Sequence, residues 1–327
     1  MVFVYVQQGT SLARQAVDAN GSIPDNAVWI DLVTPTQRED KLVEGALGIA
    51  VPTREEMQEI EVSSRLYVEN GARYMTATMM CQSDTENPKT TAVTFILSGH
   101  RLVTVRYDEP KPFTIVENKL ARSCPATVTG ELVLMELLDA VIDRAADILE
   151  RISTNVDQVS HDIFEPEVDD RARPYNDILK TIGRKGDLTS KVRESLVSIG
   201  RLLLYLANEA ANEAGSMKWA KETRAQLKGM QRDVQSLSDH ATYLSNKITF
   251  LLDAMLGVVS LQQNNIIKIF SVAAVVFMPP TLVASIYGMN FKHMPELDWS
   301  FGYPVAIVLM LLAAVLPYIF FKWKKWL

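Results

Sequence analysis

The strongest constraint on this chain is a pair of long apolar segments close to its C-terminus. Residues 269–289 ("IFSVAAVVFMPPTLVASIYGM") and 301–321 ("FGYPVAIVLMLLAAVLPYIFF") contain no Asp, Glu, Lys or Arg. A helix of about 20 apolar residues is long enough to cross the roughly 30 Å hydrocarbon core of a bilayer. The two segments therefore predict two transmembrane helices, joined by the short polar stretch 290–300.

The composition indicates a membrane-anchored protein with a large water-soluble part. Of the 327 residues, 48% are hydrophobic and the formal net charge is -6. A nucleic-acid-binding protein needs clustered Lys and Arg to neutralise phosphates, so no nucleic-acid partner is expected. Two cysteines are too few for a disulfide framework or a zinc site, which suits the cytosol. The first ten residues, "MVFVYVQQGT", resemble a β-strand rather than a signal peptide.

Residues 1–129 are predicted to form a cytoplasmic α/β domain of the α+β class. Short β-type runs such as "VFVYV", "VWIDL" and "RYMTATMM" alternate with polar segments, of which 36–47 and 53–60 are predicted helices. The runs "TTAVTFIL" and "RLVTVRY", joined by Ser98, Gly99 and His100, give the clearest hairpin signal.

From residue 130 the pattern is helical. Residues 130–215 read as a helical hairpin with the acidic tip "EPEVDD", and 216–268 read as a stalk helix. Apolar stalk residues alternate four and three apart, as in a coiled-coil seam: Met230, Val234, Leu237, Ala241, Leu244, Ile248, Leu251, Met255 and Val258. The stalk runs without a break into the first span, 269–289, so one helix of about 70 residues, on the order of 100 Å long, is expected.

Basic residues set the expected orientation. Three lysines lie in the tail 322–327 and Lys268 precedes the first span, whereas the loop 290–300 contains only Lys292. The positive-inside rule then places both termini in the cytoplasm. The loop becomes the sole extracytoplasmic segment.

A column of small and polar residues follows the stalk and the first span. It steps in heptad rhythm through Asp253, Ser260, Asn264, Ile267, Ser271, Ala274, Met278, Thr281, Ser285 and Gly288. The column lies about 200° from the apolar seam, on the other face of the same helix. Such a column suits a water-filled axis shared by several copies of the helix. The alternative is a purely structural role. Ser and Thr hydroxyls would then hydrogen-bond to backbone carbonyls of their own helix, and small residues would let neighbouring helices pack closely.

The polar loop carries a resemblance to a known family. "YGMNF" at the outer end of the first span, followed by "MPEL", a second span and "KKWL", resembles the CorA family of magnesium and cobalt transporters. The hallmark of that family is the triplet Gly-Met-Asn, here Gly288, Met289 and Asn290. Weaker similarity extends to "WIDL" and "PTREEMQEIEVSSR". The resemblance covers both spans closely and most of the chain in outline.

The resemblance implies a homopentameric funnel whose first span lines the pore and whose selectivity filter is the triplet. Five copies of Asn290 would meet Mg²⁺ through its water shell, because Mg²⁺ dehydrates reluctantly. Glu296 and Asp298 would raise the local cation concentration without forming the filter. Mg²⁺ and Co²⁺ are the expected ions, with Ni²⁺ a further candidate, and membrane lipid surrounds the spans.

By the same resemblance, Thr281 and Met278 would line the pore, and Ile267 with Phe270 would form its apolar constriction. The heptad column points to Ser271 rather than Phe270. Asn264 and Asp253 would lie toward the cytoplasmic end.

The resemblance also implies a bacterial inner membrane, and it implies that intracellular Mg²⁺ binds acidic residues between subunits and favours the closed state. The stalk position expected for one such acid is near Gly229, so Asp233 and Asp253 are the candidates for regulatory metal binding.

No energy-coupling motif is recognised: "GRKGDLTS" lacks the nucleotide-loop pattern, so no cofactor and no enzymatic activity are expected. Passive uptake driven by the membrane potential suffices. One alternative is a Zn²⁺ or Ni²⁺ transporter of the same architecture, although none of the 4 His falls on the column. The other is a non-transporting two-span sensor or scaffold, which would tolerate apolar replacement of the column.

Overall fold

The computed structural model describes residues 1–165, 174–211, 220–290, 292, 294–295 and 299–324. The chain divides into two compact units, Met1–Leu251 and Leu252–Leu327. The division falls inside a single helix, α7 (Lys221–Tyr287). The predicted stalk, 216–268, therefore contributes to both units, and each unit is described by itself.

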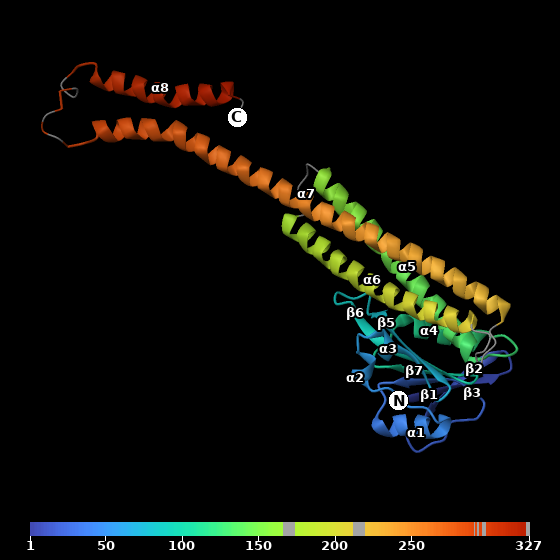
Figure 1. Ribbon diagram of the computed structural model, residues 1–327. Coiled ribbons are helices and arrows are strands. Elements are labelled where there is room, and N and C mark those ends of the chain that lie inside the picture. The colour runs from blue at the N-terminus through green and yellow to red at the C-terminus, as the bar shows by residue number, and fades with distance from the viewer. Residues whose placement is uncertain (166–173, 212–219, 291, 293, 296–298, 325–327) are drawn as a thin grey trace. The chain divides into compact units, whose positions relative to one another are not determined.

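A mixed β-sheet forms the centre of the first unit, with the strand order β2-β1-β3-β7-β6-β5-β4 (Figure 1). Its strands are β1 (Val2–Gln8), β2 (Ser11–Val17), β3 (Ala27–Val33), β4 (Leu66–Glu69), β5 (Ala72–Cys81), β6 (Lys89–Ser98) and β7 (Arg101–Arg106). Strands β3 and β7 pair in parallel, whereas the other neighbouring strands are antiparallel. The predicted hairpin is present: Ser98 pairs with Arg101, and Gly99 takes a positive φ of 59° in the turn.

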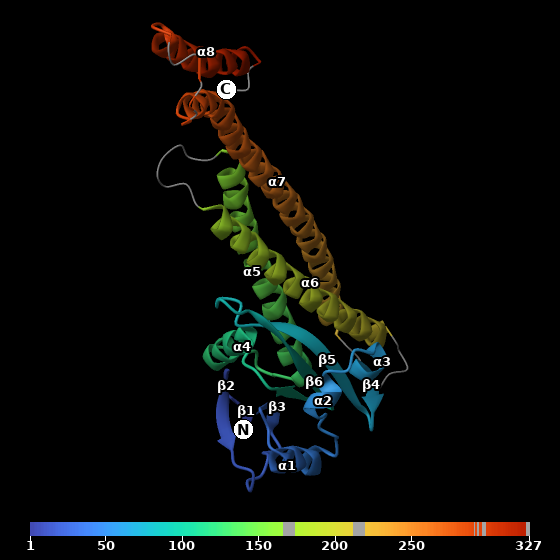
Figure 2. The ribbon, with the colours of Figure 1, turned by 90° about the vertical axis from the view of Figure 1, so that its left-hand side faces the viewer.

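Side-chain alternation divides the core between the two faces of the sheet. Val4, Ile30 and Val103 point to one face, where they form a buried cluster with Val43 and Met57. Those last two residues come from α1 (Gln37–Leu47) and α2 (Arg54–Met57). Helices α4 (Lys111–Arg122), α5 (Gly130–Phe164) and α6 (Tyr175–Ala211) cover the other face (Figure 2). The domain is thus a helix–sheet–helix sandwich.

The "WIDL" segment supplies a buried polar network beside the parallel pair. Arg106 donates from its Nη2 to Asp31 Oδ2 at 2.8 Å, and Thr104 Oγ1 donates to Asp31 Oδ1 at 2.7 Å. Trp29 Nε1 in turn donates to Thr104 Oγ1 at 2.9 Å. Asp31 is 1% exposed, so its charge depends on these partners. The network joins β3 to β7 at the centre of the sheet.

The start of α5 is held tightly against the sheet. Gly130 N donates to His100 O at 2.7 Å, and a Cβ on Gly130 would lie 2.4 Å from Leu102 N. No larger residue fits this approach without moving backbone. Thr129 caps the helix by accepting a hydrogen bond from Leu132 N. The helical half of the chain therefore begins in contact with the hairpin.

Helix α7 packs on α6 through the predicted seam. Its residues Val234, Ala241, Leu244, Ile248 and Leu251 are buried. Glycines on α6 face them: a Cβ on Gly200 would lie 3.4 Å from Val234 Cγ1, and one on Gly186 would lie 3.5 Å from Ile248 Cγ2. Helices α5, α6 and the part of α7 up to Leu251 lie side by side in both views (Figures 1 and 2).

The second unit contains the remainder of α7 and α8 (Gly302–Trp323). Both helices are long and apolar enough to cross a membrane, with mean hydropathy of 2.1 for the apolar window of α7 and 2.5 for that of α8. Helix α7 continues through Pro279 and Pro280 to Tyr287 without interruption. The prediction of an α+β domain followed by a long helix and two apolar helices is confirmed.

Candidate functional site

The polar column lies on an uncovered side of α7. In the single chain every member is exposed: Asp253, Ser260, Asn264, Ile267, Ser271, Ala274, Met278, Thr281, Ser285 and Gly288. The exposed fraction is 62% for Ile267 and 68% for Met278. The column is therefore free to face solvent or another subunit over its whole length.

Helix α8 covers a different side of the first span. Val272 is 6% exposed, and Val275 lines an apolar groove together with Pro317 and Phe320 of α8. Val276 is half-buried. With about 100° per residue, the side carrying Val272 and Val276 lies roughly opposite the column. One helix thus has a side packed on α8 and an opposite side that no other described residue covers.

Local hydrogen bonds fix two of the hydroxyl groups of the column, those of Ser260 and Thr281. Thr281 Oγ1 donates to Phe277 O at 2.7 Å, and Ser260 Oγ donates to Leu256 O at 2.9 Å. Because each hydroxyl hydrogen is used within the helix, its oxygen lone pairs remain available as acceptors. The column therefore offers oxygen acceptors, the ligand type that hydrated cations require.

The apolar part of the column contains both candidates for a constriction. Phe270 is 71% exposed and Ser271 is also exposed. Relative to Ile267, Phe270 is rotated by about 60° in one direction and Ser271 by about 40° in the other. Ile267 lies between them. If Ile267 faced the axis of a pore, Phe270 and Ser271 would flank that axis on either side.

The Gly-Met-Asn triplet follows the last turn of α7. Gly288 N donates to Ala284 O at 2.9 Å and Met289 N donates to Ile286 O at 3.2 Å. A Cβ on Gly288 would lie 3.1 Å from Ala284 O, which is a tight approach at a helix end. Asn290 is exposed. Glu296 and Asp298, predicted to attract cations, lie outside the described residues.

Asp233, the predicted regulatory residue, faces an acidic side of α5. Burial, then the charges of Asp143 and Glu136, and finally that of Asp233 raise the pKa of Asp139. Lys119 binds Glu136 and opposes this shift. Sequence reasoning missed the three acids of α5, although their spacing of three and four residues places them on one helical face.

These carboxylates are not close enough to form a metal site in a single chain. Within the part of the chain that the structure describes, no group of three or more His, Cys, Asp or Glu residues could hold a metal ion. Asp253, the other regulatory candidate, is exposed in the second unit. The structure does not bring Asp233 and Asp253 together, since they are five and a half turns apart on one helix.

An α/β domain joined by one long helix to a pair of apolar helices defines a two-span membrane protein with a large domain outside the bilayer. The family described as "CorA-like Mg2+ transporter protein" matches residues 24–324. Magnesium transport protein CorA of Escherichia coli is 36% identical over 327 residues, covering 100% of both chains. Its counterpart in Salmonella typhimurium is 37% identical over 329 residues, again covering 100% of each.

The fold agrees with this relationship. The complete structure of the CorA magnesium transporter from Methanocaldococcus jannaschii superimposes with a TM-score of 0.74 over 100% of this chain and 99% of that chain, at 17% identity. The chain belongs to the CorA-like Mg²⁺ transporter family. It is therefore related to transport proteins rather than to enzymes.

Proposed function

We propose that this protein carries Mg²⁺ passively into the cytoplasm of a bacterium, and that Co²⁺ and Ni²⁺ follow the same route. The observation that carries the proposal is the full-length identity of 36% to the Magnesium transport protein CorA of Escherichia coli. The exposed column of oxygen acceptors on α7 supports it. A membrane potential is worth about 2.3 kcal/mol per charge per 100 mV, hence about 4.6 kcal/mol for a divalent ion.

The proposed assembly is a homopentamer with α7 at its axis. Helix α8 packs on the side of α7 that carries Val272, which leaves the opposite, polar side for neighbouring subunits or water. Two spans from one chain cannot enclose a pore, whereas five copies of the column can. Both termini are then cytoplasmic, in an inner membrane, because the lysines flanking the spans lie mostly on that side.

Selectivity is assigned to a ring of Asn290 side chains at the extracytoplasmic mouth. Amide oxygens suit an ion that keeps its water shell, because they accept hydrogen bonds from bound water without displacing it. Neutral groups also hold the ion weakly enough for release. Glu296 and Asp298 in the same loop would concentrate cations nearby.

Intracellular Mg²⁺ is proposed to close the pore at Ile267 and Phe270. Acidic residues such as Asp233 and Asp253 would bind the ion between subunits, and the continuous helix α7 would connect those sites to the constriction. An ion shifts this equilibrium only by its difference in affinity for the two states, so several weak sites are required.

The test of the proposed function is Asn290→Ala in liposomes containing an Mg²⁺-sensitive dye. We expect the variant to assemble normally, because an exposed side chain buries little surface, and to lose most of its Mg²⁺ influx at an inward-negative potential. Asn265→Ala, an exposed asparagine of α7 outside the column, is the matched control and should conduct normally. Unchanged influx in Asn290→Ala would remove this residue from the filter, and absence of influx in the native protein would overturn the proposal itself.

A further inference from the structure

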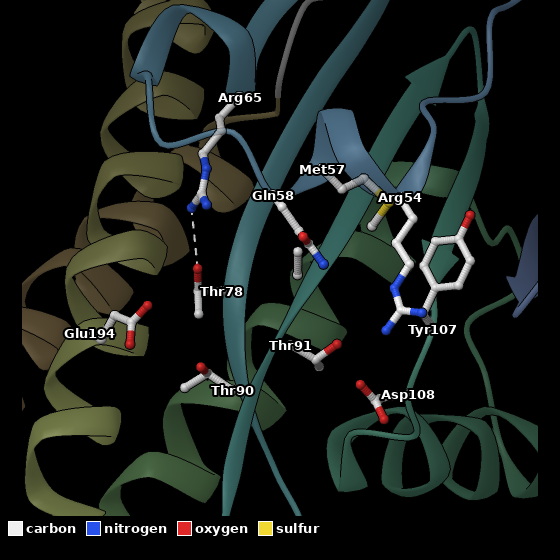
Figure 3. Close-up of a pocket in the computed structure, with 11 residues that line it drawn as sticks. Arg54, Met57, Gln58, Arg65, Thr78, Thr90, Thr91, Tyr107, Asp108 and Glu194 are labelled. Atoms are coloured by element: carbon white, nitrogen blue, oxygen red, sulfur yellow. Dashed lines mark hydrogen bonds between the residues drawn. The ribbon is translucent and has the colours of Figure 1, made fainter. Parts of the chain in front are cut away.

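A cleft on the first unit is lined mainly by basic and hydroxyl side chains. It has a volume of about 490 Å³ and lies between the α3 region (Val62–Arg65), strand β5 and one face of α6. Its lining residues include Arg65, Arg193 and Arg201. A smaller cavity of about 220 Å³ shares Arg65, Thr78 and Glu194 with it (Figure 3). Neither cavity involves the proposed ion pathway.

The arginines of the larger cleft lack acidic partners. Among the described residues, Arg65, Arg193 and Arg201 form no ion pair, although Glu194 lies on the same wall. Arg193 and Arg201 are exposed and donate no hydrogen bond within the described chain. Burial and the nearby charge of Arg201 lower the pKa of Arg65, while Glu194 opposes the shift. The cleft therefore carries three arginines against the single carboxylate of Glu194, an excess of positive charge.

The three arginines come from two elements that hydrogen bonds join through β5. Arg65 donates to Thr78 Oγ1 at 3.2 Å, as Figure 3 shows, and Thr78 N donates to Ser198 Oγ at 2.9 Å. These two bonds place Arg65 beside the part of α6 around Ser198, between Arg193 and Arg201. The latter two are eight residues apart, which is about 12 Å along the helix. All three arginines line the same cleft.

We propose that this cleft binds a small anion that carries several linked phosphate groups. A guanidinium group matches a phosphate with two parallel N–H donors, and it pays less desolvation than an ammonium group. A chain of three phosphates offers more oxygens to the three arginines at once than a single orthophosphate does. Such an anion would also touch α7, because Ser245 lines the cleft.

The ligand class includes inorganic triphosphate and nucleoside triphosphates. Two apolar side chains, Ile60 and Val197, line the same cleft and are 86% and 42% exposed. They offer a surface on which an organic group attached to the phosphates can pack. The negative charge of Glu194 opposes anion binding. Its neutral variant, Glu194→Gln, should therefore bind the anion more tightly.

The experiment is calorimetric titration of the purified full-length protein in detergent, without divalent cations, so that it does not depend on transport. Inorganic triphosphate, adenosine triphosphate and orthophosphate are compared. We expect both triphosphates to bind at least tenfold more tightly than orthophosphate, and to bind more weakly as salt rises. The double variant Arg193→Gln/Arg201→Gln should lose at least tenfold in affinity, and Glu194→Gln should gain affinity.

The matched control is Arg232→Gln, which removes one exposed arginine that does not line the cleft and should bind as the native protein does. If adenosine triphosphate binds more tightly than inorganic triphosphate, and Ile60→Ser reverses this difference, the ligand is the organic compound. If the two affinities are equal, the cleft recognises the phosphate chain alone. The proposal is overturned if neither triphosphate binds saturably at millimolar concentration, if the double variant binds normally, or if Glu194→Gln does not bind more tightly.

Discussion

At the scale of single residues, Asp84 shows how one carboxylate ties the sheet to the helices. It accepts hydrogen bonds from Arg144 at 2.6 Å, Lys111 at 3.0 Å and Arg151 at 2.5 Å. These bonds, that of Arg144 first, hold the pKa of Asp84 well below its usual value. Lys111 belongs to α4, and Arg144 and Arg151 belong to α5. The negative charge of Asp84 therefore attaches the loop after β5 to both helices.

We expect Asp84→Asn to lower stability by about 1 kcal/mol at pH 7, a small value because Asp84 is 41% exposed. A lowered folded-state pKa contributes stability that is present above the unfolded value of 3.8 and is lost as pH falls through the folded value. The difference in thermal midpoint between native and variant should therefore be constant near neutral pH and shrink below about pH 4. The control is Asp25→Asn, because Asp25 is exposed and forms no ion pair with any described residue. A difference that grows toward low pH would contradict this assignment.

At the scale of elements, the first span has two sides that differ in exposure. Ala274 belongs to the exposed column, whereas Val272 is packed. After replacement of the two native cysteines, which are buried, Ala274→Cys should react with a small water-soluble thiol reagent, and Val272→Cys should remain unmodified. Labelling of the protein in liposomes, followed by mass spectrometry, measures both. Equal reactivity at the two positions would exclude a water-filled axis along the column.

The same labelling distinguishes Phe270 from Ser271, which lie on either side of Ile267. If the axis passes Ser271, Ser271→Cys reacts faster than Phe270→Cys, and the order reverses if Phe270 forms the constriction. The sequence could not decide this point, because both residues fit a helical face and the proposed axis would be defined by neighbouring subunits.

Element prediction succeeded where a pattern was periodic over many residues. The seam from Val234 to Leu251, the spans and the hairpin at Gly99 were all recognisable. Strand β2 was missed because its outer residues Arg14 and Gln15 are exposed at the sheet edge, so its hydrophobic alternation is weak. Helix α4 was also missed, although Pro110 and Pro112 mark its start.

The candidate site was predictable as a list of residues but not as an arrangement. The triplet and the column were readable because the helix is continuous and heptad spacing converts directly into a face. The acidic face of α5 opposite Asp233 could not be derived, because it depends on how α5 and α7 pack. The arginine cleft likewise combines residues from α3, β5 and α6, which are far apart in the sequence.

At the scale of the whole molecule, one rigid helix would connect the cytoplasmic domain with the pore. We expect liposomes preloaded with millimolar Mg²⁺ to show slower influx of a second divalent ion through the native protein than liposomes loaded with chelator. Ile267→Asn and Phe270→Ser should conduct under both conditions, because polar side chains keep the constriction hydrated. Ile269→Ser, at a position rotated away from the column, should remain inhibited. Inhibition of the two constriction variants by internal Mg²⁺ would exclude closure by dewetting.

The side of α7 that α8 leaves uncovered also has a genetic consequence. If that side is completed only by identical neighbours, then a single altered copy changes the axis shared by all of them. In a cell expressing equal amounts of native protein and Asn290→Ala, most assemblies would contain at least one defective subunit. The altered allele should therefore be dominant, and magnesium-limited growth of such a cell should resemble that of a strain without the protein more closely than that of the native strain.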